Sequence, residues 1–284
     1  MKISFWSPSR HNCAVTSNLV CISIMFSNMY LFKSLIIENH LQRNKINDLI
    51  NFRTNHNYIC ENKNYHERYI GMNSILYELS LMQNTYNTRE LCGGKVVKIL
   101  ENVTEEILCN HLYYIPTDNR INKILFESET NKHIKSILKA SEEFADLTFI
   151  DTGNSNIIGT KEVLDEADLV IVNLSQDPSE LHNFFKNYPS ILSKSLILIS
   201  NYDKKSYFNQ KKIIQTYLLD QSNIATVPYN TNYKEALRCG KLIGFLINNC
   251  QCEEWDQNYY FMSEVIEATK KIYNIIIFII RSSR

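Results

Sequence analysis

The sequence predicts an α/β fold: a doubly wound, mainly parallel sheet of seven to eight strands flanked by helices. Two observations predict it. Short apolar runs alternate with longer amphipathic segments, and several runs, such as "LVIVNL" and "LILIS", are apolar throughout. Continuous apolar strands are typical of a parallel sheet that is covered on both faces. The alternation of strand and helix is typical of a doubly wound arrangement.

The individual elements follow from these two patterns. Short apolar runs predict strands at residues 2–6, 34–38, 111–116, 146–151, 169–174, 196–200 and 224–227. Amphipathic stretches between them predict helices at residues 16–30, 132–144, 160–167, 178–188, 207–219 and 233–239. Residues 43–108 are polar and Asn-rich at first and then helical in pattern, which we interpret as an insertion. A C-terminal helix is expected at about residues 256–284, and residues 1–284 are expected to form one domain.

Composition restricts the class of protein. The chain has 284 residues, 44% of them hydrophobic, so it can bury a sizeable core. Its formal net charge is zero, which argues against a general attraction to nucleic acid. The eight cysteines form no CxxC pair and no zinc-finger spacing, as expected of reduced cysteines in a cytosolic protein. We find no secretory signal and no apolar run of the ~20 residues that a membrane span needs.

Candidate chemistry lies where the predicted strands end, because ligands of an open parallel sheet bind at the carboxyl ends of its strands. Thr16 and Ser17 open the helix after the first strand, where free backbone N–H groups favour an anion. Asp151 closes the buried run "DLTFID", as a carboxylate that holds Mg²⁺ would. Each signal has an ordinary alternative, since such residues also serve as helix caps or turn residues.

In their joint order these segments resemble the ParA/MinD family of deviant Walker A ATPases, whose fold is that of P-loop NTPases. The resemblance runs through "KISFWSPSRHNCAVTSN", "DLTFIDTG", "EADLVIVNLSQDP", "LILISNYD" and "VPYN", and it covers nearly the whole chain. It is strongest to the TadZ/CpaE-like branch that serves assembly of Tad pili. The resemblance implies a protein of the bacterial cytoplasm that binds ATP with Mg²⁺ and forms a homodimer.

The phosphate-binding loop departs from the family's pattern, Lys-Gly-Gly-x-Gly-Lys-Thr-Thr. The corresponding residues are Arg10, His11, Asn12, Cys13, Ala14, Val15, Thr16 and Ser17. Arg10 falls on the signature lysine, His11, Asn12 and Ala14 on the glycines, and Val15 on the phosphate-binding lysine. The resemblance assigns nucleotide binding to this segment and Mg²⁺ to Thr16 and Asp151. The missing lysine predicts slow or absent hydrolysis, since losing one such transition-state contact costs about 3 kcal/mol or more.

Two other parts of the site follow from the resemblance. The family's "DxDPQ" loop is "ENHLQ" here, which places His40 where an acidic residue helps to position the attacking water. His40 could order a water, although an isolated loop histidine is more often solvated. Thus Arg10, His40 and Asp151 are the candidate catalytic residues. Nucleotide-base contacts are expected from Asn201, Pro228, Tyr229 and Asn230, for which the alternative is a role as turn residues.

The apolar run from Ile275 to Ile280 has three interpretations. It could contact the inner membrane peripherally, as anchors of the MinD branch do, dock into a partner, or pack on the protein's own sheet. For the whole protein we expect a localisation or assembly factor of a pilus or secretion machine with an eroded nucleotide site. The alternative is a slow ATPase that cycles between monomer and nucleotide-sandwich dimer in cellular positioning or DNA partitioning.

Overall fold

The computed structural model describes residues 1–9, 13–41, 46–50, 71–85, 93–108, 111–117, 122–154 and 159–282. Within these residues, eight strands form one sheet in the order β3-β4-β2-β5-β1-β6-β7-β8. Their bounds are β1 Lys2–Ser7, β2 Ser34–Glu38, β3 Glu105–Leu108, β4 Leu112–Ile115, β5 Leu147–Asn154, β6 Leu169–Leu174, β7 Ser195–Tyr202 and β8 Ile224–Pro228. All neighbouring pairs are parallel except β3 with β4, so the predicted doubly wound sheet is confirmed.

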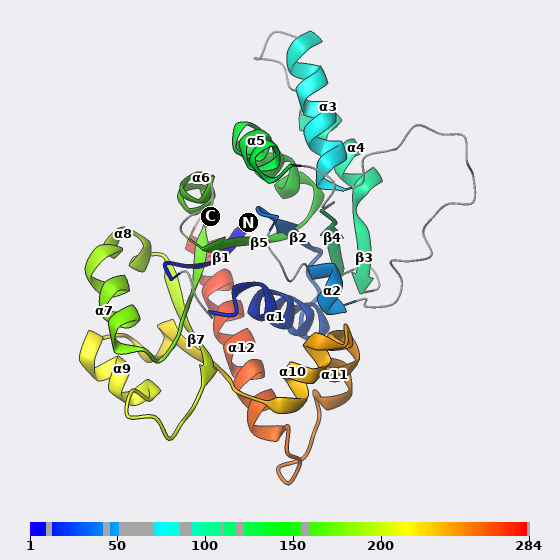
Figure 1. Cartoon of the computed structure of the whole chain (residues 1–284). Helices are drawn as coiled ribbons and strands as arrows, with labels where there is room; N and C mark the ends of the chain where they lie inside the picture. Colours follow the sequence, from blue (N-terminus) through cyan, green and yellow to red (C-terminus); the bar gives the residue numbers. More distant parts are fainter. Residues whose placement is uncertain are drawn as a thin grey trace.

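Helices connect the strands and cover both faces of the sheet (Figure 1). Among the described residues they are α1 Val15–Met29, α2 Ile46–Ile50, α3 Met72–Thr85, α4 Gly93–Val103, α5 Lys123–Phe144, α6 Thr160–Glu166, α7 Pro178–Asn187, α8 Pro189–Leu192, α9 Gln210–Tyr217, α10 Thr231–Arg238, α11 Leu242–Asn249 and α12 Tyr259–Ser282. A short 3-10 turn, Gln221–Asn223, precedes β8.

Three elements were not predicted. Strand β3 lies in the segment that we interpreted as an insertion, and it pairs antiparallel with β4 at the sheet edge. Its sequence, EEIL, is half polar because only part of an edge strand is buried. Helix α11 and the short α8 were also missed, and α5 begins at Lys123 instead of residue 132.

Alternation along the central strands sends neighbouring side chains into different cores. Ile3 and Phe5 of β1 join the core under α1, α11 and α12, whereas Trp6 joins the core under α7, α8 and α9. In β2, Ile36 joins the first core, and its neighbours face α3, α4 and α5. This two-sided burial is the reason that the strands are apolar throughout.

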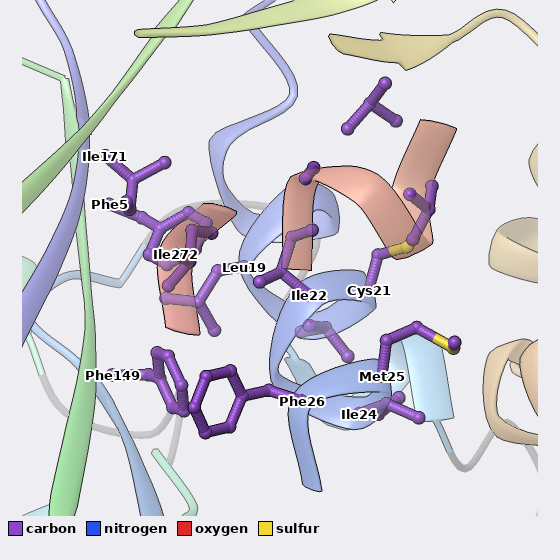
Figure 2. Close-up of a cluster of buried hydrophobic side chains, with 14 of the residues drawn as sticks. Phe5, Leu19, Cys21, Ile22, Ile24, Met25, Phe26, Phe149, Ile171 and Ile272 are labelled. Atoms are coloured by element: carbon purple, nitrogen blue, oxygen red, sulfur yellow. The ribbon is translucent and has the colours of Figure 1, made fainter. Parts of the chain in front are cut away.

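Helix α1 is the centre of the largest core (Figure 2). Every residue from Asn18 to Ser27 is buried, because the sheet covers one side of the helix while α11 and α12 cover others. Phe26 meets Phe149 of β5 edge-on, with ring centroids 5.8 Å apart. Each buried side chain of this size contributes about 1.5–3 kcal/mol, so the start of α1 rests on a firmly held helix.

The C-terminal run packs on the protein's own core. Ile272 and Ile276 are fully buried, and Ile275, Ile279 and Ile280 are partly buried against the same cluster. Of the run, Phe278 alone is largely exposed, at 71%. The structure therefore supports the docked interpretation over the membrane anchor or partner helix. No helix within the described residues is long and apolar enough to cross a membrane.

Candidate functional site

Helix α1 starts next to the carboxyl end of β1, between the ends of its neighbours β5 and β6. Its N-cap residue, Ala14, is left-handed, with φ 50° and ψ 32°, where the resembling family has glycine. The first turn contains no acidic residue, and no side chain caps it. The N–H groups of the first turn have no carbonyl partner within the helix, so they form a favourable site for an anion.

A buried polar network fixes the first turn of α1 to the ends of two neighbouring strands. The Asn18 amide donates to Asn173 Oδ1 of β6 and to Ser200 Oγ of β7, each at 2.8 Å. Ser200 Oγ in turn donates to the Cys13 carbonyl at 2.8 Å. Two strands and the helix thus hold the backbone just before Ala14, which lets an alanine keep a conformation that usually requires glycine.

Two side chains of the loop are not suited to binding or attacking a phosphate. Val15 packs against the core under α1, so it cannot supply the charge that the family's lysine supplies. The Cys13 thiol donates to Glu180 Oε1 of α7 at 2.8 Å. Burial and this carboxylate raise the pKa of Cys13 to about 12, so the thiol stays protonated and is not a nucleophile.

Asp151 and His40 form a buried ion pair. His40 Nε2 lies 3.0 Å from Asp151 Oδ1, and the two side chains are 2% and 0% exposed. Burial acts to raise the pKa of Asp151, but His40, Thr16 and the Gly153 N–H together hold it below its usual value. Burial likewise acts to lower the pKa of His40, and the Asp151 and Glu38 carboxylates outweigh it and raise that pKa. The solvated alternative for His40 is therefore wrong.

Glu38 lies beside Asp151, because the two are register partners at the ends of β2 and β5. Its Oε1 accepts from the Ile46 N–H at 3.1 Å, and its Oε2 accepts from Tyr114 Oη at 2.6 Å and from Thr117 Oγ1 at 2.9 Å. Burial raises the pKa of Glu38 above its usual value. Glu38 is thus fully engaged in bonds that tie β2, β4 and α2 together.

The expected base-binding residues lie at the ends of β7 and β8. Asn201 has a left-handed backbone, with φ 50°, Pro228 is buried, and Tyr229 is 62% exposed. The Asn230 side chain caps α10 by accepting from the Tyr233 N–H at 2.8 Å, and it donates to Asn258. For Asn230 the geometry favours the alternative role, a structural cap.

Seven candidate residues lie at one edge of the sheet: Cys13, Ala14, Val15, Thr16, Ser17, His40 and Asp151. Arg10, His11 and Asn12 lie outside the described residues. The sequence analysis missed the bonds that Asn18 and Glu38 make with other strands. The register partnership of Glu38 with Asp151 could have been inferred only from the strand order, which puts β2 beside β5.

The residues present do not fit Mg²⁺. This ion prefers six oxygen ligands at about 2.0–2.1 Å. Asp151 Oδ1 is already paired with a nitrogen group, and both oxygens of Glu38 accept protein hydrogen bonds. Asp151 Oδ2 is the carboxylate oxygen of this pair that makes no hydrogen bond within the described residues. The described part of the chain also contains no cluster of three or more His, Cys, Asp or Glu placed to hold a metal ion.

Comparison with known proteins gives a match in structure. No family model matches the sequence, and no curated protein matches it. A ParA family ATPase from Chlorobium tepidum TLS is similar with a TM-score of 0.64 at 13% identity, covering 94% of this chain and 98% of that chain. MinD in the MinC:MinD complex of Aquifex aeolicus gives 0.62 at 9% identity, covering 96% of each chain.

A third similar structure carries a nucleotide. It is the septum site-determining protein MinD complexed with Mg-ADP from Pyrococcus horikoshii OT3, with a TM-score of 0.60 at 11% identity over 95% of each chain. At these identities the similarity concerns the fold, and it extends over nearly the full length of the chain. The chain therefore has the fold of the ParA and MinD ATPases.

Proposed function

We propose that this chain binds a nucleotide at the start of α1 and acts as a localisation or assembly factor whose nucleotide turnover is slow or absent. It would work by dimerising and by docking protein partners, in the manner of the TadZ/CpaE-like branch that serves pilus or secretion machinery. Nucleotide-free and nucleotide-bound states would then differ in partner affinity, and hydrolysis would not be needed for docking.

The start of α1 carries this proposal. Ala14 has the left-handed backbone that a phosphate loop needs at this point, and the first turn beyond it has no acidic residue of its own and no side-chain cap. An alanine in this conformation costs about 1–2 kcal/mol relative to its usual conformations. A strained backbone that the surrounding network keeps in place is a common feature of ligand-binding sites.

Slow turnover follows from two side chains. Val15 packs into the core where a lysine would stabilise charge on the phosphates, and His40 is paired with Asp151 instead of positioning water. Loss of one charge-stabilising contact costs about 3 kcal/mol, roughly a hundredfold in rate. Arg10 would supply the remaining positive charge of the loop, as the resemblance implies.

The class of partner is proposed from similarity. One of the similar structures is a MinC:MinD complex, which supports protein docking on this fold. The pilus branch rests on the resemblance in sequence, and genes for a pilus ATPase and pilins beside this gene would favour it. The zero net charge argues against DNA partitioning as the main role.

The decisive experiment is a titration of the full chain with fluorescent ATP, with sedimentation velocity on the same samples. We expect saturable binding and a shift from monomer to dimer. Hydrolysis is expected to be at least ~100-fold slower than that of a MinD protein assayed in parallel. Absence of binding would refute the proposal, and hydrolysis at the MinD rate would refute the slow-turnover part.

A matched pair of variants locates the site. Ser17→Asp adds a carboxylate to the first turn of α1, which favours the helix but repels phosphate. Gln210→Glu adds the same charge to the first turn of α9, which also has no acidic residue there. Weakened binding in the first variant alone is the expected result, and equal effects would place the nucleotide elsewhere.

The alternative, an active ATPase that cycles between monomer and sandwich dimer, makes a different prediction. In that case hydrolysis is readily measured, and both the hydrolysis and the nucleotide-dependent dimerisation disappear in Asp151→Ala. In the proposed factor, Asp151→Ala changes folding stability, because the residue is buried and paired with His40, and any hydrolysis is already slow.

A further inference from the structure

The two carboxylates beside the proposed phosphate site are bound by groups of the protein itself. Glu38 and Asp151 end adjacent parallel strands as register partners, and both are fully buried. Glu38 receives hydrogen bonds from a backbone N–H and from the hydroxyls of Tyr114 and Thr117. Each of its two oxygens therefore already accepts at least one hydrogen bond from the protein.

Asp151 is engaged in a different way. Its Oδ1 accepts from the Gly153 N–H at 3.0 Å and lies 3.0 Å from His40 Nε2. A cation bound to Oδ1 at the usual Mg–O distance of about 2.1 Å would meet the imidazole at that oxygen. An ion could bind at Oδ1 only after His40 moved, and the His40 side chain is 2% exposed. Oδ2, which accepts no hydrogen bond within the described residues, is buried, so an ion there would also lie beside the imidazole.

The residue type at position 40 explains why Asp151 is paired within the protein. The resembling family carries an acid in the loop after the second strand, and an acid there would add negative charge beside Asp151. Here the residue is His40, an imidazole that pairs with the carboxylate directly. Replacing an acid by a basic group lowers the negative charge of the site, so the site attracts an external cation less strongly.

We propose that the His40 side chain takes the place of the divalent cation at Asp151, so that this protein binds nucleotide phosphates without Mg²⁺. The phosphate chain would be held by the N–H groups at the start of α1 and by basic side chains. The metal half of this inference stands on the Glu38–His40–Asp151 geometry, and only the nucleotide half rests on the proposed function.

In the first test Mn²⁺ is titrated into the full chain without nucleotide, and its binding is measured by electron paramagnetic resonance. Wild type and Asp151→Asn are expected to bind the same amount of Mn²⁺, because Asp151 of the wild-type protein holds no metal ion. His40→Asp, which restores the acid, is expected to gain one Mn²⁺ site that a second substitution, Asp151→Asn, abolishes. An Asp151-dependent Mn²⁺ site in wild type would overturn the proposal.

Two further variants serve as controls for the Mn²⁺ result of His40→Asp. His40→Asp brings three carboxylates together and could fold poorly, so His40→Ala, which frees Oδ1 without adding charge, is measured beside it. His133→Asp places an acid at another buried histidine, in α5, and is expected to gain no site. If neither folded His40 variant gains the Mn²⁺ site, the proposal is wrong.

The second test separates this inference from the proposed function. Fluorescent ATP is titrated into wild type in Mg²⁺ buffer and in EDTA, and the two dissociation constants are expected to agree. A Kd tenfold or more weaker in EDTA would overturn the inference, since tenfold corresponds to about 1.4 kcal/mol of cation-dependent binding. No binding in either buffer would refute the nucleotide function, and the Mn²⁺ result would still decide the role of His40.

Discussion

Replacing His40 with alanine would leave Asp151 as a buried carboxylate without its partner. Breaking a buried ion pair by removing one member typically costs about 3–5 kcal/mol. Asp151 keeps the Gly153 N–H at 3.0 Å, and Thr16 still lowers its pKa. We therefore expect a loss near the lower end, about 3 kcal/mol of unfolding free energy.

The assay is equilibrium unfolding in urea near neutral pH, with the midpoint and slope compared between variants. The matched control is His133→Ala. It removes an imidazole that is also buried, but its Nε2 lies 3.9 Å from the carboxylate of Glu129, which is 22% exposed and keeps Lys132 as a partner. The control is expected to cost about 1 kcal/mol. A His40→Ala loss no larger than the control loss would refute the ion-pair reasoning.

The double substitution and the pH dependence check the same pair independently. Adding Asp151→Ala to His40→Ala is expected to recover part of the loss, because the unpaired charge is removed. The folded pKa of His40 is raised above its ordinary 6.5, so its stabilisation is complete below that value and is lost as pH rises through the folded pKa. The pKa of Asp151 is lowered from 3.8, so its contribution is present above that value and is lost as pH falls through the folded pKa. The His40→Ala protein should lack the alkaline loss.

Three other substitutions test the core, the loop and the Glu38 network, each by urea unfolding. Ile272→Ala should lower the free energy of unfolding by about 2–4 kcal/mol, because it opens a cavity under α12. Phe278→Ala, at an exposed position of the same helix, should change it by no more than about 0.5 kcal/mol. Similar losses in both variants would mean that α12 is not docked on the core. Ala14→Gly should raise stability by up to about 1 kcal/mol, because glycine adopts φ 50° without strain; a destabilised variant would show that the turn is not left-handed. Tyr114→Phe should cost about 1–3 kcal/mol, since it takes a buried hydrogen bond from Glu38, and a neutral result would contradict that bond.

The fold could be predicted from the sequence because its signals are local. Strands apolar on both faces, such as the run from Leu169 to Leu174, and amphipathic stretches between them report burial directly, residue by residue. Elements with weaker periodicity were missed or misplaced. Strand β3 is half polar at the sheet edge. The first turns of α5 expose the apolar Ile124 and Leu125 and bury the polar Glu127 and Thr130, so neither element produced a clear pattern.

The candidate site was predicted in part. The order of segments along the chain placed Thr16, His40 and Asp151 near one another, because the carboxyl ends of parallel strands meet at one edge. What each side chain does there was not predictable. A histidine in a loop has the same sequence signature whether it is solvated or buried, and Val15 has the same signature whether it lines a ligand site or packs on a core.

By itself the sequence determined the class of fold and the order of most of its elements, and its resemblance to the ParA/MinD family led us to expect a phosphate loop without glycine and lysine. Only the tertiary structure decided that Ala14 keeps the left-handed turn, that His40 pairs with Asp151, and that the C-terminal run lies on the protein's own sheet. The physical reason is that composition and periodicity report each residue's own preference for burial. Ion pairs, strained turns and docking faces depend instead on strand register, which brings together residues far apart in the chain.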